Sequence, residues 1–468
     1  MVFHSPNFIV FFAVLLLLYY AFRSIRLPLL VIGNLLFYAA SGLGMLVVFV
    51  SMTILTFVCV HGMKRWKGWF WVGIVLNVGN LVLFKYTLLL FDTWEQLTGV
   101  SVWVYDAWAT SVVLPVGISF YTFQFLSYLI DVRRGQLIPT RSLIRFWIYI
   151  SFFPQLIAGP IMRGDELVPQ LEGLKDKRIR FADMKYGMGL FMVGLLKKIA
   201  LADPLASYVN PLFAKETMTA VEAWLAAYGF GFQIYFDFSA YSDMALGLAW
   251  MMGIRLILNF DSPYISANPS EFWRRWHISL SRWIRDYIYI GLGGNRKGPV
   301  RVQLNLLAAM LISGLWHGAM WTFVLWGGLH GVLLIVHRWS LKLNRWHGVQ
   351  KMRLNGVYRI AAVFVFFHII MWTWVFFRAE SFGQAMEMTR LMLQVNPVAL
   401  VQHPFMIGVA ALSVLHVVEY GVRHHEKLAS KWWHFAPFPI RSAVYTALLL
   451  LLFYLQRGET YEFIYFQF

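Results

Sequence analysis

Three stretches between residues 231 and 331 decide the fold: GFQIYFDFSAYSDMALGLAWMMGIRLILNFDSPY (231–264), NPSEFWRRWHISLSRWIRDYIYIGLGGNRKG (268–298) and NLLAAMLISGLWHGAMWTFVLWGGLHG (305–331). Each stretch is largely apolar but is interrupted by ionisable residues. These are Asp237, Asp243, His277, His317 and His330. Inside a lipid bilayer such groups are rare and usually face the protein interior or a water-filled cavity. We therefore expect the functional centre here, with the rest of the chain as its scaffold.

The composition excludes an ordinary soluble protein. Of the 468 residues, 59% are hydrophobic and only 13% are charged, whereas soluble domains carry about 25% charged residues. Apolar runs recur that approach or exceed the length needed to cross about 30 Å of hydrocarbon. They cover residues 8–22, 27–39, 43–60, 69–91, 112–130, 143–161, 186–203, 220–255, 303–337, 358–377, 404–420 and 441–455. The expected fold is an all-α polytopic membrane protein, with residues 1–468 forming one membrane domain.

The basic residues predict topology and do not indicate nucleic-acid binding. The net charge is +17, but the basic side chains gather in short loops between apolar runs, where they mark the cytoplasmic side. Such clusters follow the first, third and fifth runs, which places the N-terminus outside. The segment 255–302 has eight basic and three acidic residues, so it is predicted to lie at the cytoplasmic interface. Residues 456–468 then form an extracytoplasmic C-terminal tail.

Two apolar runs are predicted to be irregular. The run at 143–161 has basic flanks on both sides and contains Pro154, Gly159 and Pro160, which favours a re-entrant element over a full span. The run at 220–255 would be about 54 Å long as one helix, too long for a single straight span. We expect a kink or a break in it near Asp237 and Asp243, whose carboxylates could cap a break or orient a histidine.

The segment 271–290 is predicted to be one amphipathic helix. Asn268 and Glu271 have the spacing of a capping box, and Pro269 suits the first helical position. His277 falls on the apolar stripe of this helix and so points toward the membrane or the protein interior. It is either a site residue or a core histidine hydrogen-bonded to backbone.

His317 is the stronger candidate for catalysis. The arm that leads to it, from Gln303 to Trp316, is about 21 Å long as a helix, which is shorter than a span. His317 would then lie within the membrane, in the glycine-bracketed break SGLWHGA. A neutral imidazole can act as a general base at physiological pH. The alternative is a helix-packing histidine. His330 and Asn305 are candidate neighbours of His317, although a purely structural role is favoured for both.

Several long motifs resemble the membrane-bound O-acyltransferase (MBOAT) family, in its alginate O-acetyltransferase, or AlgI-like, branch. They are FPQLIAGPIMR (153–163), YFDFSAYSDMALGLAWMMGI (235–254), NFDSPY (259–264), FWRRWHISLSRWIRDYIYIGLGGNR (272–296) and GLWHGAMWTFVLWGGLHG (314–331). The resemblance implies roughly eleven transmembrane helices, with re-entrant and interfacial helices around a central funnel. It also implies that His317 is the central family histidine and His277 the second one.

The same resemblance implies the reaction. Acetyl groups would pass from a cytoplasmic thioester, acetyl-CoA, across the membrane for O-acetylation of an exported polysaccharide that is alginate- or cellulose-like. A periplasmic acetyltransferase of the SGNH-like type and the polysaccharide export machinery would be the partners, with membrane lipid around the protein. No metal is expected. The location would be a bacterial inner membrane, with both termini in the periplasm.

The C-terminal sequence FIYFQF (463–468) matches an aromatic ending of this branch and of the teichoic acid D-alanylation system. The resemblance implies that Tyr465 carries the acyl group to the partner. The alternative is simple anchoring at the membrane interface, which Tyr and Phe favour.

Two other classes of function fit the pattern of broken helices and buried polar groups. One is a transporter of the polymer or of an acylated carrier, without acyl-transfer chemistry. The other is a non-catalytic assembly scaffold, which would tolerate substitution of both His277 and His317.

Overall fold

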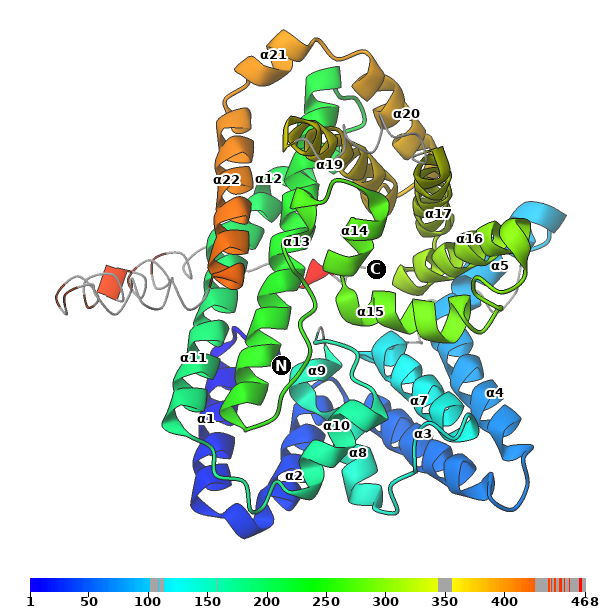
Figure 1. The fold of residues 1–468 in the computed structure, drawn as a ribbon, viewed down its shortest axis with the longest axis vertical. Coiled ribbons are helices and arrows are strands. Elements are labelled where there is room, and N and C mark those ends of the chain that lie inside the picture. Colours follow the sequence, from blue (N-terminus) through cyan, green and yellow to red (C-terminus); the bar gives the residue numbers. More distant parts are fainter. Residues whose placement is uncertain are drawn as a thin grey trace.

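The computed structural model describes residues 1–101, 108, 113–157, 159–343 and 356–425, together with residues 437, 439, 442, 446, 447, 450, 454, 463 and 464. Every regular element in these residues is a helix, which confirms the all-α prediction. Figure 1 shows the arrangement, with α13 running through the middle of the molecule.

The helices follow one another with few long connections. Residues 1–101 form α1 (Pro6–Ala21), η1 (Arg23–Ile25), α2 (Arg26–Ala39), α3 (Leu43–Gly62), α4 (Trp69–Leu81), η2 (Val82–Tyr86) and α5 (Thr87–Thr98). Residues 113–251 form α7 (Ile118–Arg133), α8 (Leu143–Ser151), α9 (Phe153–Leu156), α10 (Gly164–Glu172), α11 (Phe181–Leu196), η3 (Lys197–Ala202), α12 (Asp203–Phe213) and α13 (Ala220–Met251).

The second half of the chain supplies the remaining elements. They are η4 (Pro263–Ile265), α14 (Pro269–Arg275), α15 (Ile278–Trp283), η5 (Ile284–Tyr289), α16 (Gly298–His317), α17 (Trp321–Leu343), α19 (Gly356–Arg378), α20 (Phe382–Leu393), α21 (Pro397–Gln402) and α22 (Phe405–His424). Three of the short elements, η2, η3 and η5, are π-helical turns.

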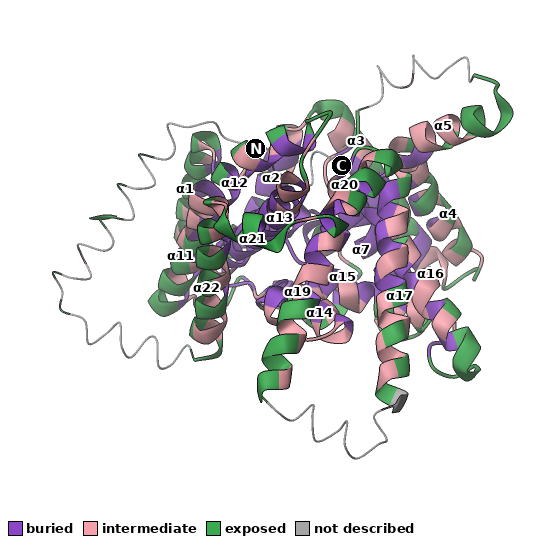
Figure 2. Ribbon diagram, turned by 90° about the horizontal axis from the view of Figure 1, so that it is seen from above, coloured by how far each residue is buried: buried purple, intermediate pink, exposed green. Residues whose placement is uncertain are grey.

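Five described helical stretches are long and apolar enough to cross a membrane. They are Leu43–Gly62, Trp69–Thr98, Gly298–His317, Gly356–Arg378 and Phe405–His424, and a sixth is possible if Pro6–Ala21 and Arg23–Ala39, bent by 117°, form one broken span. Large apolar side chains are exposed on the outer faces of these stretches, for example Val47, Val75 and Val414, and Figure 2 shows the exposed residues on the periphery. The chain is thus a multi-pass membrane protein, while the count of about eleven spans stays a prediction.

The predicted break in the 220–255 run is wrong. Helix α13 is continuous over 32 residues, or about 48 Å, and it passes Asp237 and Asp243 without interruption. The reason is that cations on other elements pair with these carboxylates. Lys198 lies 2.8 Å from Asp237, and Lys197 lies 2.7 Å from Asp243. The helix therefore keeps its own hydrogen bonds and needs no break to satisfy its acids.

The run at 143–161 is interrupted as predicted. Helix α8 has nine residues and α9 has four, and Phe152 between them has the non-helical backbone angles φ −53° and ψ 104°. The side chain of Asn34, on α2, donates to the Ser151 hydroxyl (3.0 Å) and accepts from the Phe153 N–H (3.1 Å). Irregular backbone within a membrane protein is tolerated where protein groups satisfy it in this way.

Helices α16 and α17 form a closely packed antiparallel hairpin. A β-carbon on Gly314 would lie 2.2 Å from the Phe323 carbonyl oxygen, and one on Gly327 would lie 2.2 Å from the Met310 carbonyl oxygen. Glycine is needed at both positions because the two backbones touch. Helix α16 has 20 residues, about 30 Å, so the arm that leads to His317 is longer than the predicted 14-residue arm.

Candidate active site

His317 is the last residue of α16, and its side chain is only 2% exposed. Its ring centroid lies 4.9 Å from that of Trp316, 5.2 Å from that of Trp326 and 5.1 Å from that of Phe377. The next residue is Gly318, where a β-carbon would lie 2.1 Å from the Phe323 ring. The chain therefore leaves α16 directly after the histidine, as the glycine-bracketed motif predicts.

His277 lies in a break between α14 and α15, so the prediction of one helix over 271–290 is wrong. Its backbone is left-handed, with φ 42° and ψ 56°, a conformation that costs a non-glycine residue about 1–3 kcal/mol. Asn259 holds it there. The Asn259 carbonyl accepts from the Ile278 N–H (2.9 Å), and its Oδ1 accepts from the N–H (3.2 Å) and hydroxyl (2.8 Å) of Ser279. These contacts replace the helical pattern that the sequence indicates.

The imidazole of His277 is fully buried among aromatic rings. The ring of Phe238 meets it edge-on at 4.7 Å, and Trp316 lies 5.9 Å away. Neither ring nitrogen hydrogen-bonds to another of the described residues. Burial lowers the pKa of His277 to about 3, so the ring is neutral at physiological pH.

The structure brings His277, His317 and His330 into one aromatic cluster. Trp316 lies between His277 and His317, whereas Trp326 contacts both His317 and His330, the latter at 4.7 Å. His330, on α17, is also 3.3 Å from the Thr373 hydroxyl through its Nε2. His330 is therefore near His317, and the Trp326 ring contacts both imidazoles.

Asn305 is placed differently from the prediction. It lies twelve residues before His317 on α16, which is about 18 Å along the helix, and its side chain donates to the Gly294 carbonyl (3.2 Å). Asn305 thus fixes the glycine-rich turn that precedes α16 and is not a neighbour of His317.

Asp237 and Asp243 belong to buried ion-pair groups and do not cap a helix break. Asp243 pairs with Lys197 (2.7 Å) and with Arg423 on α22 (3.0 Å), and Glu419 joins both of these cations. Asp237 pairs with Lys198, which also lies 2.8 Å from Asp203. Phe238, next to Asp237, is the α13 side chain that touches His277. The two acids therefore fix α13 within the fold.

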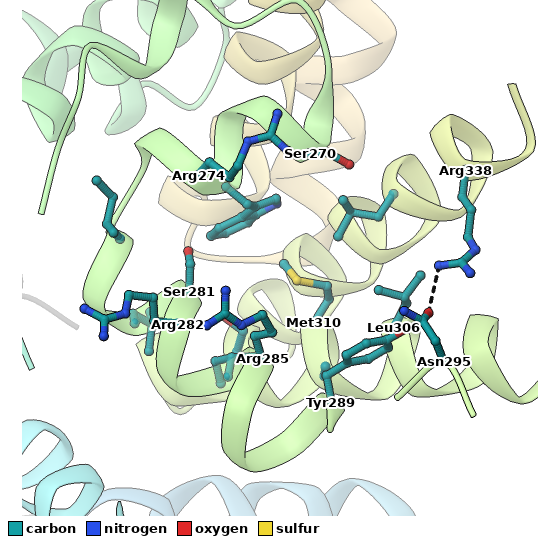
Figure 3. A pocket seen from close by; sticks show the side chains of 17 residues that line it. Ser270, Arg274, Ser281, Arg282, Arg285, Tyr289, Asn295, Leu306, Met310 and Arg338 are labelled. Atoms are coloured by element: carbon teal, nitrogen blue, oxygen red, sulfur yellow. Dashed lines mark hydrogen bonds between the residues drawn. The ribbon is translucent and has the colours of Figure 1, made fainter. Parts of the chain in front are cut away.

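A cavity of about 770 Å³ opens beside α14, α15 and the middle of α16. Figure 3 shows four arginines around it. They are Arg274, Arg282, Arg285 and Arg338. Trp273, Met310 and Ser313 also line the cavity, and Ser313 lies one helical turn before His317 on the same face of α16. The cavity thus leads from a basic rim to within one turn of the histidine.

A second cavity, of about 330 Å³, lies at the C-terminal end of α16, where Trp316 lines it. Lys85, Ser119, Phe120 and Trp316 are among its lining residues. The two cavities share no lining residue, and Trp316, which contacts both His277 and His317, lines only the second. The residue after His277, Ile278, lines the first cavity, and the residue before His317, Trp316, lines the second.

Tyr465 lies outside the described residues, but the two residues before it are deeply buried. The ring of Phe463 is 4.2 Å from that of Tyr241 and 5.8 Å from that of Phe238, and the Ile464 N–H donates to Asp237 Oδ2 (2.8 Å). Phe463 and Ile464 are at most 1% exposed.

Two residues that shape this site are not among those predicted from the sequence. Asn259 sets the backbone of His277, and Lys85 contacts the backbone of His317 (3.1 Å). A signal existed for Lys85, since a lone cation inside an apolar run is a functional candidate by default. Asn259 had no such signal, because loop asparagines are common.

A family model described as "MBOAT, membrane-bound O-acyltransferase family" matches residues 133–379. This range contains His277, His317 and His330. It also contains Asn259, whereas Lys85 and Tyr465 lie outside it.

The curated relatives include acyltransferases for three kinds of cell-surface polymer. The "Probable alginate O-acetylase AlgI" of Pseudomonas putida is 40% identical over 397 residues, or 83% of this chain and 79% of the relative. The "Peptidoglycan O-acetyltransferase" of Helicobacter pylori is 37% identical over 71% of this chain and 66% of its own length. The "Teichoic acid D-alanyltransferase" of Bacillus subtilis is 29% identical over 57% of this chain and 69% of its own length.

Proposed function

The chain belongs to the membrane-bound O-acyltransferase family and is an O-acyltransferase, and on that premise we propose that it carries acetyl groups across a bacterial inner membrane. The donor is a cytoplasmic thioester, acetyl-CoA, and the final acceptor is a hydroxyl of an exported, alginate- or cellulose-like polysaccharide. A periplasmic SGNH-like acetyltransferase and the export machinery complete the pathway. About eleven spans in one domain, with both termini in the periplasm, are part of the same proposal.

The basic cavity is the observation that supports this donor most directly. Coenzyme A carries phosphate groups, and arginine binds phosphate through paired hydrogen bonds. Arg282 lies 2.7 Å from Glu166, and Arg285 lies 2.6 Å from Asp286. Arg338 donates to Asn295 Oδ1 (3.1 Å), whereas the Arg274 side chain has neither an ion pair nor a hydrogen bond within the described residues. Arg274 is therefore the cation most available to a phosphate. Trp273 and Met310 offer an apolar surface to the pantetheine arm.

The proposed chemistry needs one base and one acceptor hydroxyl. His317 takes the proton of the hydroxyl while the hydroxyl oxygen attacks the thioester carbonyl carbon. The new C–O bond forms, the C–S bond breaks, and the departing thiolate takes up the proton from His317. His277, neutral and buried beside Trp316, would shape the site next to this step. General bases of this kind contribute about 10²–10⁴-fold to a rate.

Tyr465 is the proposed first acceptor. Support comes from the buried residues Phe463 and Ile464, which directly precede Tyr465. The ring of Phe463 lies beside that of Phe238, and Phe238 in turn contacts His277. An acetyl ester on Tyr465 would then be passed to the periplasmic transferase. The transporter without acyl-transfer chemistry is not retained, because the family and its relatives are acyltransferases.

The test uses membrane vesicles of both orientations and radiolabelled acetyl-CoA added from outside. Label should be incorporated by inverted vesicles, in which the cytoplasmic face is exposed. Arg274→Ala should raise KM for acetyl-CoA about tenfold, the effect of losing one charged hydrogen bond. Arg296→Ala is the matched control, since Arg296 is in the same basic segment but does not line the cavity. Incorporation by right-side-out vesicles alone would contradict the assigned donor side.

A further inference from the structure

Two adjacent side chains of one π-helical turn reach the end of the helix that carries His317. The turn is η2, which continues α4 toward α5. The ammonium of Lys85 donates to the carbonyls of Trp316 (2.7 Å) and His317 (3.1 Å), and to the Ser119 hydroxyl (3.2 Å). The Tyr86 hydroxyl donates to the Leu315 carbonyl (2.8 Å). Three consecutive carbonyls at the end of α16 are thereby satisfied from another span.

These contacts answer a specific need of α16. The last four carbonyls of a helix have no partners within it, and the helix C-terminus carries partial negative charge. In an apolar interior, a carbonyl without a hydrogen bond costs several kcal/mol. An ammonium has three protons to donate, and all three protons of Lys85 are used here. The cation therefore stabilises a helix end that stops abruptly at Gly318.

The location of η2 indicates a functional role in addition to stabilising the fold. A π-helical turn is an uncommon element that recurs at functional sites, and η2 is far from α16 in sequence, 232 residues from Lys85 to His317. Among the described residues, the Lys85 ammonium and the Tyr86 hydroxyl bond to no backbone other than that of residues 315–317. Those residues are the ones that carry Trp316 and His317 into the aromatic cluster.

We infer that Lys85 and Tyr86 are positioning residues, which fix the end of α16 and so hold the His317 imidazole in place for acyl transfer. The inference rests on the proposed role of His317. Neither side chain needs to touch the substrate. Lys85 acts through the carbonyls of Trp316 and His317, and Tyr86 acts through the carbonyl of Leu315, two residues before the histidine.

The experiment compares Lys85→Met, Lys85→Arg, Tyr86→Phe and Thr87→Val in the full-length protein. Acetyl content of the exported polymer is measured at matched membrane abundance, together with deuterium uptake of the peptide spanning residues 312–322. Lys85→Met should lower acetylation about tenfold or more, since small displacements of a catalytic group cost up to about 10²-fold. Uptake in that peptide should rise in parallel.

The other variants make the inference testable even if Lys85→Met is poorly folded. Lys85→Arg keeps the charge and should restore much of the acetylation. Tyr86→Phe removes only one hydroxyl and should change both readouts in the same direction by a smaller amount. Thr87→Val is the control, because the Thr87 hydroxyl bonds to the Leu83 and Val82 carbonyls at the start of η2 and to no described group of α16.

Two outcomes would overturn the inference. One is unchanged acetylation and unchanged uptake in both Lys85→Met and Tyr86→Phe. The other is lost acetylation in Lys85→Met with normal uptake and no rescue by Lys85→Arg, which would assign Lys85 a role other than positioning. His317→Ala separates this from a failure of the proposed function. If that variant stays active, the role of His317 is wrong, whereas the uptake data still report whether η2 fixes α16.

Discussion

The two histidines beside Trp316 are held by different means. His277 takes its position from a left-handed backbone conformation that Asn259 imposes, so its surroundings must offset a local cost of about 1–3 kcal/mol. His317 takes its position from the end of α16. Strained backbone that the fold maintains is concentrated at functional sites. The geometry thus favours a functional role for His277 as well as for His317.

Substitution of the two histidines is expected to separate a base from a supporting residue. His317→Ala should abolish polymer acetylation at near-normal membrane abundance, because it removes the proposed proton acceptor. His277→Ala should lower acetylation strongly but incompletely, since it leaves His317 in place. Acetyl content per amount of membrane protein measures both. Near-normal acetylation in His317→Ala would reject its role, and loss of the protein itself would show that the residue is structural.

The sequence predicted the contacts of single residues only where the two partners are a few positions apart in the chain. The Asn268 side chain accepts from the Glu271 N–H (2.9 Å), and Pro269 begins α14, as the cap pattern predicts. The contact of Asn259 with Ser279 spans 20 residues, and that of Lys85 with His317 spans 232. Nothing in the spacing of residues records such distant pairings, so these contacts could not be predicted.

At the scale of helices, apolar length predicted the elements, but their breaks depended on distant charges. The broken run at 143–161 was predictable, because Pro154, Gly159 and Pro160 act on their own backbone. The expected break in α13 does not occur, because Lys197 and Lys198 on η3 supply countercharges. The segment 271–290 breaks at His277 because Asn259 competes for its backbone groups. A polar residue in an apolar run therefore marks either a break or a buried pair.

The α16–α17 hairpin offers a prediction with an internal control. Gly327→Ala should destabilise the protein by about 1–3 kcal/mol, because its β-carbon would lie 2.2 Å from the Met310 carbonyl oxygen. Gly328→Ala should be nearly neutral, since the nearest atom to its β-carbon is a Leu311 side-chain carbon at 3.4 Å. Thermal unfolding of the two purified variants in the same detergent measures the difference. Equal midpoints would show that the hairpin relaxes without cost.

At the scale of the whole molecule, two separate cavities approach one histidine cluster. The basic cavity ends one turn before His317, and the cavity that contains Lys85 reaches Trp316 from another side. An enzyme that takes a donor from one face and serves an acceptor at the other needs such a division. Elsewhere in the molecule, the ion pair of Asp243 with Arg423 joins α13 to α22.

Tyr465→Phe tests the proposal that the C-terminal tail carries acetyl. Phe463 and Ile464 are buried against α13, with the Ile464 N–H bonded to Asp237 (2.8 Å). A tail that served only as an interface anchor would gain nothing from a buried backbone hydrogen bond to a carboxylate. The substitution keeps the ring and removes only the nucleophilic oxygen, so an anchor would keep full acetylation. A relay would lose it completely at normal protein levels, while Tyr461→Phe, a change in the same tail, should have no effect. If the Tyr465→Phe strain exports fully acetylated polymer, His317 must serve another acceptor directly.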